Sequence, residues 1–189
     1  MKKKTIAFDF DDVICDISKA FLNFNRKRYK KSIQYHRATE YDLYKILDLS
    51  PAEEIRRWDE FFKSPQFCYP APEKDLKRSL KLLKKKYKLV LLTARSKPWQ
   101  GQVRKWISKY LPNIFDKGIF SQNFKSADNS KGSICRQQQI FTLIDDNPKE
   151  INSCLKYGSK IIVFTQPWNQ KISKFVPRIK SLKQLPKFL

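Results

Sequence analysis

The stretch TIAFDFDDVICD, residues 5–16, places a short apolar run directly before a group of carboxylates. An apolar run of this length that ends at a polar cluster is typical of a buried strand, which we predict over residues 5–10. Asp9 and Asp11 lie two residues apart, and in an extended chain side chains with that spacing point to the same side. We therefore predict a buried strand that ends in paired carboxylates.

Apolar runs separated by helical patterns continue along the second part of the chain. From residue 73 onward we predict helices over 73–86, 99–110, 130–138 and 148–157, and strands over 87–93, 118–121, 140–144 and 160–165. Buried strands joined by helices imply a parallel sheet with helices on both faces. The predicted fold class is therefore α/β, with a Rossmann-like parallel sheet.

The segment after the first strand has a different character, because it contains no convincing strand pattern. Apolar residues recur at helical spacing over residues 16–31. A second helix is expected to begin at Ser50, since Ser50, Pro51 and Glu53 are residue types that favour the cap, first and third positions of a helix.

Three prolines between residues 64 and 72 predict a connection that leads back to the sheet. We therefore predict that residues 1–15 and 73–189 form an α/β core. Residues 16–72 would then form a small helical cap, inserted after the first strand.

The composition is strongly basic. The 189 residues carry 40 Lys+Arg against 18 Asp+Glu, a formal net charge of +22, and 41% of them are hydrophobic. That hydrophobic share is enough to build a core, which argues against an intrinsically disordered chain. The charge predicts attraction to phosphate on a nucleic acid, a nucleotide or an anionic membrane, although Lys-rich helix faces are also common as solvated surface.

Four scattered Cys without a CxxC pair and a single His do not have the spacing of a zinc site, and they give no sign of a disulfide scaffold. The apolar run near the N-terminus is interrupted by Asp9 before it reaches the length of a signal-peptide core. No apolar stretch approaches the length of a membrane span. We therefore expect a cytoplasmic protein without membrane contact.

Acidic residues gather at the ends of two predicted strands. Six of the 18 acids lie there: Asp9, Asp11, Asp12 and Asp16 in one stretch, and Asp145 and Asp146 in the other. In an open parallel sheet, ligands bind at the carboxyl ends of strands. Clustered carboxylates repel one another, and Mg²⁺ relieves that repulsion through oxygen ligands alone. One carboxylate can also attack phosphorus to form an aspartyl phosphate while its neighbour moves protons.

Four short motifs, in order along the chain, resemble those of the haloacid dehalogenase phosphatase superfamily. FDFDDVICD resembles its first motif, DxDx[TV], at Asp9 and Asp11, and LLTAR resembles its second motif at Thr93. Lys131, 14 residues before Asp145, resembles the third motif, and LIDDN resembles the fourth. Within the superfamily, the TAR, KxxIC and FTQPWN segments make the chain most similar to the 5′(3′)-deoxyribonucleotidase-like group.

The resemblance implies a catalytic role for two aspartates. Asp9 would attack phosphorus, and Asp11 would protonate the leaving oxygen and then activate water. The Mg²⁺ ligands that it implies are the Asp9 carboxylate, the Asp11 carbonyl, and Asp145 or Asp146. The phosphate-binding residues that it implies are Thr93, Ala94, Arg95 and Lys131; Arg95 could instead pair with a nearby acid.

Two positions depart from the family pattern. Asp12 stands where many members have Gly, which adds charge and backbone stiffness beside the nucleophile. Ile17 stands where the mammalian nucleotidases place an aromatic residue near the base. Candidate substrate contacts in the cap are Ile17, Tyr41, Tyr44 and Trp58. Trp58 and its neighbours Phe61 and Phe62 either line a base site or pack the cap, and helical spacing favours packing.

The function expected from these features is a Mg²⁺-dependent phosphomonoesterase that acts on a small phosphorylated metabolite, a (deoxy)nucleoside monophosphate. An alternative is a phosphatase of polynucleotide ends, held to its substrate by the positive charge. A third is a non-catalytic, basic nucleic-acid-binding module on the same scaffold, which the intact motifs argue against. The sequence contains no pattern that sets an oligomeric state.

Overall fold

The computed structural model describes residues 3–64, 70–124 and 128–189. Most of the predicted proline-rich connection at residues 64–72 therefore lies outside the described residues. Among those described, no helix has both the length and the apolar character needed to cross a membrane.

A six-stranded parallel sheet forms the centre of the fold, in the order β3-β2-β1-β4-β5-β6. The strands are β1 (Thr5–Phe8), β2 (Lys88–Thr93), β3 (Lys117–Phe120), β4 (Thr142–Asp145), β5 (Ile161–Phe164) and β6 (Arg178–Ile179). The central strand β1 pairs with β2 on one side and with β4 on the other, so that Ala7 lies beside both Val90 and Leu143. The strand order reverses between β1 and β4, which is where sheets of this kind bind their ligands.

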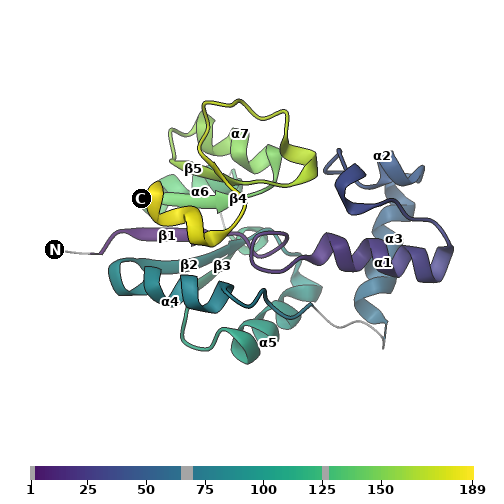
Figure 1. The fold of residues 1–189 in the computed structure, drawn as a ribbon, viewed down its shortest axis with the longest axis horizontal. Helices are drawn as coiled ribbons and strands as arrows, with labels where there is room; N and C mark the ends of the chain where they lie inside the picture. Colours follow the sequence, from purple (N-terminus) through teal and green to yellow (C-terminus); the bar gives the residue numbers. More distant parts are fainter. Residues whose placement is uncertain (1–2, 65–69, 125–127) are drawn as a thin grey trace.

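Helices cover both faces of the sheet (Figure 1). One face packs against α4 (Leu76–Lys86), α5 (Gln100–Tyr110) and a 3₁₀ turn at Leu182–Lys187, and the other packs against α6 (Lys131–Gln137) and α7 (Pro148–Lys156). Alternation along β1 explains how one strand serves both faces. Ile6 and Phe8 belong to the first core, whereas Ala7 belongs to the second. The predicted α/β class with a parallel sheet is confirmed.

Several element boundaries differ from those predicted. The first strand ends at Phe8 rather than at residue 10, because the chain turns at once, and the amides of Ile14 and Cys15 both donate to the Phe10 carbonyl, at 3.0 and 2.9 Å. Strand β6, which pairs with β5, was not predicted because a two-residue strand has no readable periodicity.

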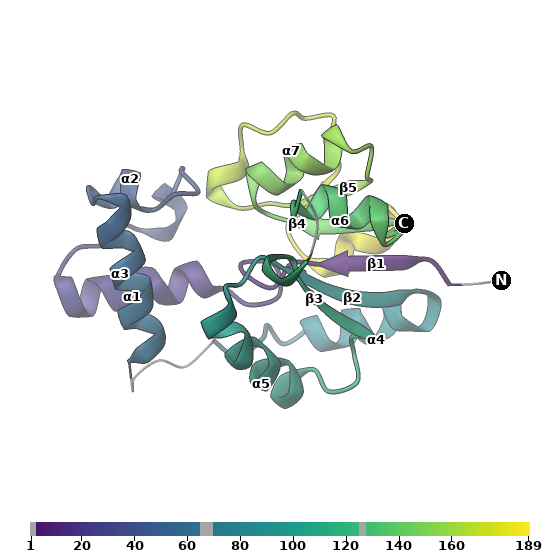
Figure 2. The same cartoon turned by 180° about the vertical axis from the view of Figure 1, so that it is seen from behind.

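Between β1 and α4 the structure describes three α-helices, which stand at the carboxyl ends of the strands (Figures 1 and 2). They are α1 (Ile17–Tyr29), α2 (Tyr44–Leu47) and α3 (Pro51–Lys63). They share an apolar cluster of their own, in which Phe21 stacks on Trp58 with ring centroids 3.6 Å apart. Ser50 caps α3 as predicted, because its hydroxyl accepts the Glu53 amide at 3.1 Å.

Asp12 controls the turn between β1 and α1. Its φ of 56° lies in the left-handed region, which Gly adopts freely and Asp tolerates better than most other residues. Its buried carboxylate accepts hydrogen bonds from the amide of Ser18, at 3.0 Å, and from the Ser18 hydroxyl. Asp12 therefore ties the turn to the first residues of α1, where a Gly could not.

Candidate active site

Asp9 directly follows β1, and its amide donates to the Ile144 carbonyl at 2.9 Å, which holds it beside β4. Its side chain is buried, and Oδ1 accepts two hydrogen bonds, from the Phe10 amide at 2.7 Å and from Lys131 Nζ at 2.8 Å. Among the described residues, Oδ2 of Asp9 accepts no hydrogen bond, so it is the oxygen open to a ligand.

Lys131 is the first residue of α6 and is only 1% exposed. Its Nζ lies 2.8 Å from Asp9 Oδ1 and 2.7 Å from Asp145 Oδ2, so one cation is shared by two carboxylates from different strands. The start of α6 is fixed by Ser130, which caps it, and by Glu150 of α7, whose Oε2 accepts the Lys131 amide at 2.7 Å. Contacts to both the backbone amide and the side-chain Nζ of Lys131 therefore hold its ammonium group in place.

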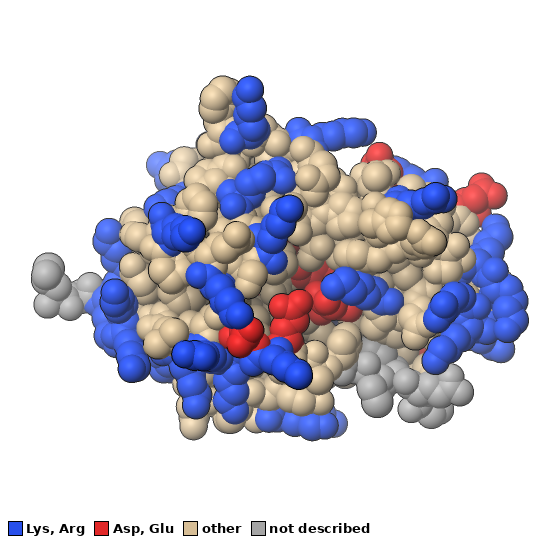
Figure 3. All heavy atoms as spheres, in the orientation of Figure 1, with Lys and Arg blue, Asp and Glu red and all other residues tan. Residues whose placement is uncertain are grey.

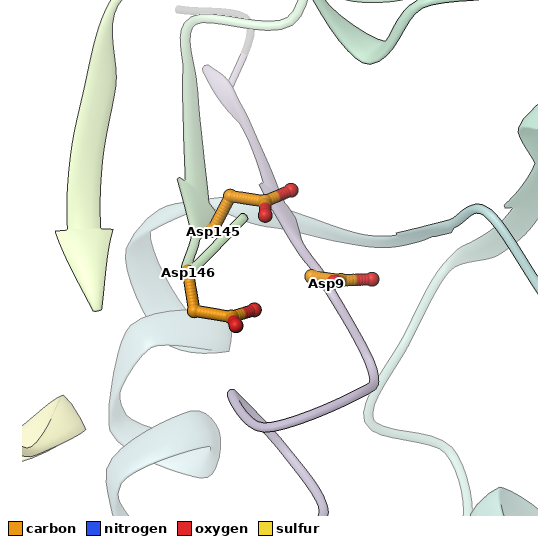
Figure 4. Close-up of side chains that lie close together, drawn as sticks. All are labelled: Asp9, Asp145 and Asp146. Atoms are coloured by element: carbon orange, nitrogen blue, oxygen red, sulfur yellow. The ribbon is translucent and has the colours of Figure 1, made fainter. Parts of the chain in front are cut away.

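Asp145 and Asp146 end β4 and follow it, and both are fully or almost fully buried. Together with Asp9 they bring three carboxylates to one place, with one oxygen of each within 4.8 Å of the others. Figure 4 shows the three side chains extending to the same side of the sheet edge, from the ends of β1 and β4.

Burial disfavours the charged form of the carboxylates in this cluster. It raises the pKa of Asp145 to about 7, against the opposing effect of Lys131. It also raises the pKa of Asp146 well above its ordinary value, with a further contribution from the neighbouring Asp145 charge. The pKa of both carboxyl groups is thus raised although the Lys131 ammonium group lies nearby.

The donor set fits a hard divalent cation. The three side chains offer carboxylate oxygens only, which are the ligands that Mg²⁺ prefers. Asp11, whose predicted contribution is its backbone carbonyl, lies in the same turn but is not one of the three clustered carboxylates.

Asp11 is the most accessible of the catalytic candidates, with a side chain 26% exposed. It forms an ion pair with Arg95, whose guanidinium also lies over the Phe62 ring, 4.6 Å from its centroid. Of the two roles left open for Arg95, the structure therefore shows pairing with an acid. Burial raises the pKa of Asp11, while Arg95 opposes the rise. A raised pKa suits a carboxyl group that must carry a proton to a leaving group.

Thr93 ends β2 beside β1 and is fully buried. Its Oγ1 accepts the amide of Arg95 at 3.2 Å, which folds the chain back at the end of the strand. The structure thus gathers Thr93 and Arg95 at the same edge of the sheet as the aspartates.

A cavity of about 390 Å³ opens over this edge, and helices α1 and α3 contribute to its walls. Asp11, Ala94 and Arg95 line it from the core side. Of the four predicted substrate contacts in the cap, Ile17, Tyr41 and Trp58 line the cavity, whereas Tyr44 does not. Trp58 packs on Phe21, as its helical spacing favoured, and it also lines the cavity.

The segment after β5 contributes residues to which the sequence had assigned no role. Trp168 donates from Nε1 to Asp146 Oδ2 at 2.9 Å, and it also lines the cavity. Gln166 donates from Nε2 to the Asp12 carbonyl at 2.6 Å and accepts the Tyr35 hydroxyl, also at 2.6 Å. Their position after the carboxyl end of β5, which lies next to β4, could have identified them as candidates for the site.

The geometry agrees with comparisons with known proteins. A family model described as "5' nucleotidase, deoxy (Pyrimidine), cytosolic type C protein" matches residues 3–187. The chain belongs to this nucleotidase family. It is therefore a phosphatase, and its motifs are those of the haloacid dehalogenase superfamily, as the resemblance predicted.

Individual relatives of this nucleotidase family member are distant but match over most of their length. A "Putative nucleotidase" of Oceanobacillus iheyensis is 19% identical over 175 residues, 89% of this chain and 90% of that protein. A "Putative nucleotidase" of Bacillus cereus is 23% identical over 183 residues, 94% of each. A haloacid dehalogenase-like family hydrolase from Streptococcus pneumoniae has the same fold, with a TM-score of 0.66 and 13% identity over 99% of both chains.

Proposed function

We propose that this phosphatase hydrolyses nucleoside or deoxynucleoside monophosphates in a Mg²⁺-dependent reaction that passes through a phosphoryl group on Asp9. The observation that supports it best is the arrangement around Asp9. Its Oδ1 is held by Lys131 and by the Phe10 amide, while Asp11 lies two residues further on, facing the cavity. The nucleotide substrate is supported by membership of the nucleotidase family.

In the first half of the reaction, a carboxylate oxygen of Asp9 attacks phosphorus and the bond from phosphorus to the leaving oxygen breaks. Asp11 donates a proton to that leaving oxygen, which departs as an alcohol. Lys131 holds Asp9 in position and offsets the negative charge that gathers on the phosphoryl oxygens. Thr93 and the amides that follow it bind those oxygens.

In the second half, Asp11 takes a proton from water, and the water oxygen attacks phosphorus. The bond between phosphorus and Asp9 breaks, which releases inorganic phosphate and restores the carboxylate. Asp9, Asp145 and Asp146 would hold Mg²⁺, with the Asp11 carbonyl as a further ligand. A bound Mg²⁺ supplies positive charge that neutralises the phosphate and the clustered carboxylates.

Residues 16–72 are proposed to act as a cap over this site. Their helices stand at the carboxyl ends of the strands, and residues of α1 and α3 line the cavity together with Arg95. A cap in this position restricts access to the site and makes the contacts that select the leaving group.

The test is the release of inorganic phosphate from nucleoside monophosphates by wild-type protein, with Mg²⁺ and with EDTA, and by Asp9→Asn. Wild-type protein is expected to need Mg²⁺. Asp9→Asn keeps the shape of the side chain and is expected to lose at least about a thousandfold in kcat. Asp48→Asn is a matched control, because Asp48 directly follows α2 and its side chain is fully exposed. Turnover by Asp9→Asn at the rate of this control would contradict the mechanism.

A further inference from the structure

The cavity over the site has an acidic lining in a strongly basic protein. Five acids and one cation line it: Asp11, Asp12, Asp42, Glu54, Asp59 and Arg95. The whole chain has 40 Lys+Arg against 18 Asp+Glu, so the balance of charge in the cavity is opposite to that of the molecule. In Figure 3, blue side chains are spread widely over the visible face, whereas the largest group of red ones lies near its middle.

The one lining cation is already engaged. Arg95 pairs with Asp11, on the core side of the cavity. Among the described residues, no lysine lines the cavity, and the nearest cap lysine in an ion pair with a lining acid is Lys45, which binds Asp42 at 3.0 Å from outside the cavity. A second anionic group on a ligand would therefore find no open cation in the described wall.

Two acids on α3 leave their charge unneutralised. Glu54 accepts a hydrogen bond from Trp58 Nε1 at 3.2 Å, which is a neutral donor, and Asp59 makes no ion pair among the described residues. Burial raises the pKa of Glu54, and hydrogen bonds from the Trp58 indole and from the Tyr44 and Leu43 amides oppose the rise. Both residues belong to α3, and both line the cavity.

Aromatic rings from both the cap and the core complete the wall of the cavity. Tyr41, Trp58, Phe62, Trp99 and Trp168 all line the cavity. Flat apolar surfaces favour a flat ring in the ligand, and carboxylates favour positive charge and N–H donors over further negative charge. Two like charges held close together near a protein surface repel each other more strongly than in bulk water.

We propose that Glu54 and Asp59 are specificity-determining residues, which make the cavity accept phosphomonoesters with an uncharged or cationic ring as leaving group and reject those with a second negative charge. The inference rests on the proposed function. In this proposal the net charge of the molecule attracts phosphate esters in general. Glu54 and Asp59 then select among those esters by the charge of the leaving group. The end of a polynucleotide, which carries a further phosphate beside the first, is disfavoured.

Three aryl phosphates of equal ring size test the inference: 4-(aminomethyl)phenyl, 4-methylphenyl and 4-carboxyphenyl phosphate. They place a positive, a neutral or a negative group at the same position of the ring. We expect kcat/KM of the wild-type protein to fall in that order, with at least about a tenfold difference between the cationic and anionic esters at low salt. Attraction by the net charge of +22 alone would give the reverse order.

The double variant Glu54→Gln/Asp59→Asn keeps side-chain shape and removes both charges. It is expected to reduce the cation-to-anion ratio to within about threefold. The matched control is Glu40→Gln/Asp48→Asn, which removes two carboxylates from residues that do not line the cavity. The control is expected to keep the wild-type ratio, and circular dichroism with thermal melts establishes that each variant is folded.

Equilibrium binding of the same three esters to Asp9→Asn separates failure of the inference from failure of the proposed function. If neither these esters nor a nucleoside monophosphate is hydrolysed, but binding follows the predicted order and loses it when Glu54→Gln/Asp59→Asn is added, the proposed function is wrong and the inference holds. If the esters are hydrolysed or bound without regard to charge, or if the double variant keeps the wild-type ratio, the inference is overturned.

Discussion

The ammonium group of Lys131 is shared between Asp9 and Asp145, which come from two different strands and are themselves buried. A buried charge that loses its partner costs more than an exposed one, because water cannot replace the partner. The stability of the site and its chemistry therefore depend on the same side chain.

We expect Lys131→Met to lower the free energy of unfolding by about 3–5 kcal/mol in Mg²⁺-free buffer, because it leaves two buried carboxylates without a cation. Added Mg²⁺ should recover part of the loss, since a cation bound to the folded state stabilises it. Urea unfolding with EDTA and with Mg²⁺ measures both effects. Lys183→Met is the control, because Lys183 pairs with Asp75 in an exposed position and should cost at most about 1 kcal/mol. Equal losses in the two variants would argue against this role for Lys131.

The hydrogen bond from Trp168 to Asp146 leads to a second expectation. Trp168→Phe keeps an aromatic ring but removes the indole donor, so Asp146 is no longer oriented. We expect Mg²⁺ to bind about 10–100-fold more weakly, measured by calorimetric titration. Trp106→Phe also removes an indole hydrogen bond, to the Pro70 carbonyl, and should leave Mg²⁺ binding unchanged. An unchanged affinity in Trp168→Phe would exclude the positioning role.

The sequence was sufficient to predict which residues at the ends of neighbouring strands lie close together. Asp9 and Asp145 come together as expected, because parallel strands bring their carboxyl ends to one edge. Lys131, which begins α6 and pairs with both, was indicated only by the family resemblance. The hydrogen bond of Trp168 was not readable, since it depends on how the chain after β5 folds back beside β4. The same holds for the place of Tyr44, which does not line the cavity.

Among the elements, the contact between α6 and α7 determines where Lys131 stands. Gly132 makes it possible, because a Cβ at that position would lie 2.4 Å from the backbone carbon and oxygen of Ser153 and 2.6 Å from the Cys154 amide nitrogen. Backbone atoms of a packed helix cannot move aside without shifting the helix. Any side chain at position 132 would therefore push α6, and Lys131 with it, away from α7.

We expect Gly132→Ala to reduce the free energy of unfolding by about 1–3 kcal/mol or more, and to lower kcat because Lys131 moves. Gly101→Ala is the matched control in α5, where a Cβ would meet nothing within 4 Å. There the same substitution should be neutral or stabilising by about 0.5–1 kcal/mol, since Ala favours a helix interior over Gly. Chemical denaturation of both variants makes the comparison, and a Gly132→Ala variant as stable as Gly101→Ala would contradict the packing argument.

The types and order of the main elements could be predicted because their hydrophobic periodicity is strong. Helix α3, for example, combines an apolar face with a Ser50 cap and a proline at its first position. Shorter elements escape such patterns: α2 has four residues and β6 has two. Such short elements form because of tertiary contacts that no local sequence pattern encodes. Strand β6, for example, depends on its pairing with β5.

Over the whole molecule, the net charge of +22 acts at longer range than any contact in the site. We expect kcat/KM for an anionic phosphate ester to fall by about tenfold as NaCl rises from roughly 20 to 300 mM, because salt screens the attraction between enzyme and substrate. The kcat at saturating substrate should change little, since the ester is then already bound. Steady-state kinetics across this range measure both quantities. A salt-independent kcat/KM would identify the excess lysines as solvated surface with no role in capture.

The net charge alone is compatible with a nucleic acid, a nucleotide or an anionic membrane as partner. The positions of the charges in the folded chain add information that the composition lacks. Two acids of the cavity wall, Glu54 and Asp59, come from α3, whose register against the core the sequence does not specify. The positive exterior and the acidic cavity are thus properties of the folded chain.

The central claim is that Asp9 carries the phosphoryl group, and rapid quenching of a single turnover tests it most directly. Wild-type protein is mixed with a ³²P-labelled nucleoside monophosphate and Mg²⁺, quenched in acid on the millisecond scale, digested and mapped. We expect a transient, hydroxylamine-sensitive label on the peptide that contains Asp9, absent in Asp9→Asn and retained in Asp48→Asn. Release of phosphate with no labelled peptide at any time, or a label on another residue, would contradict it.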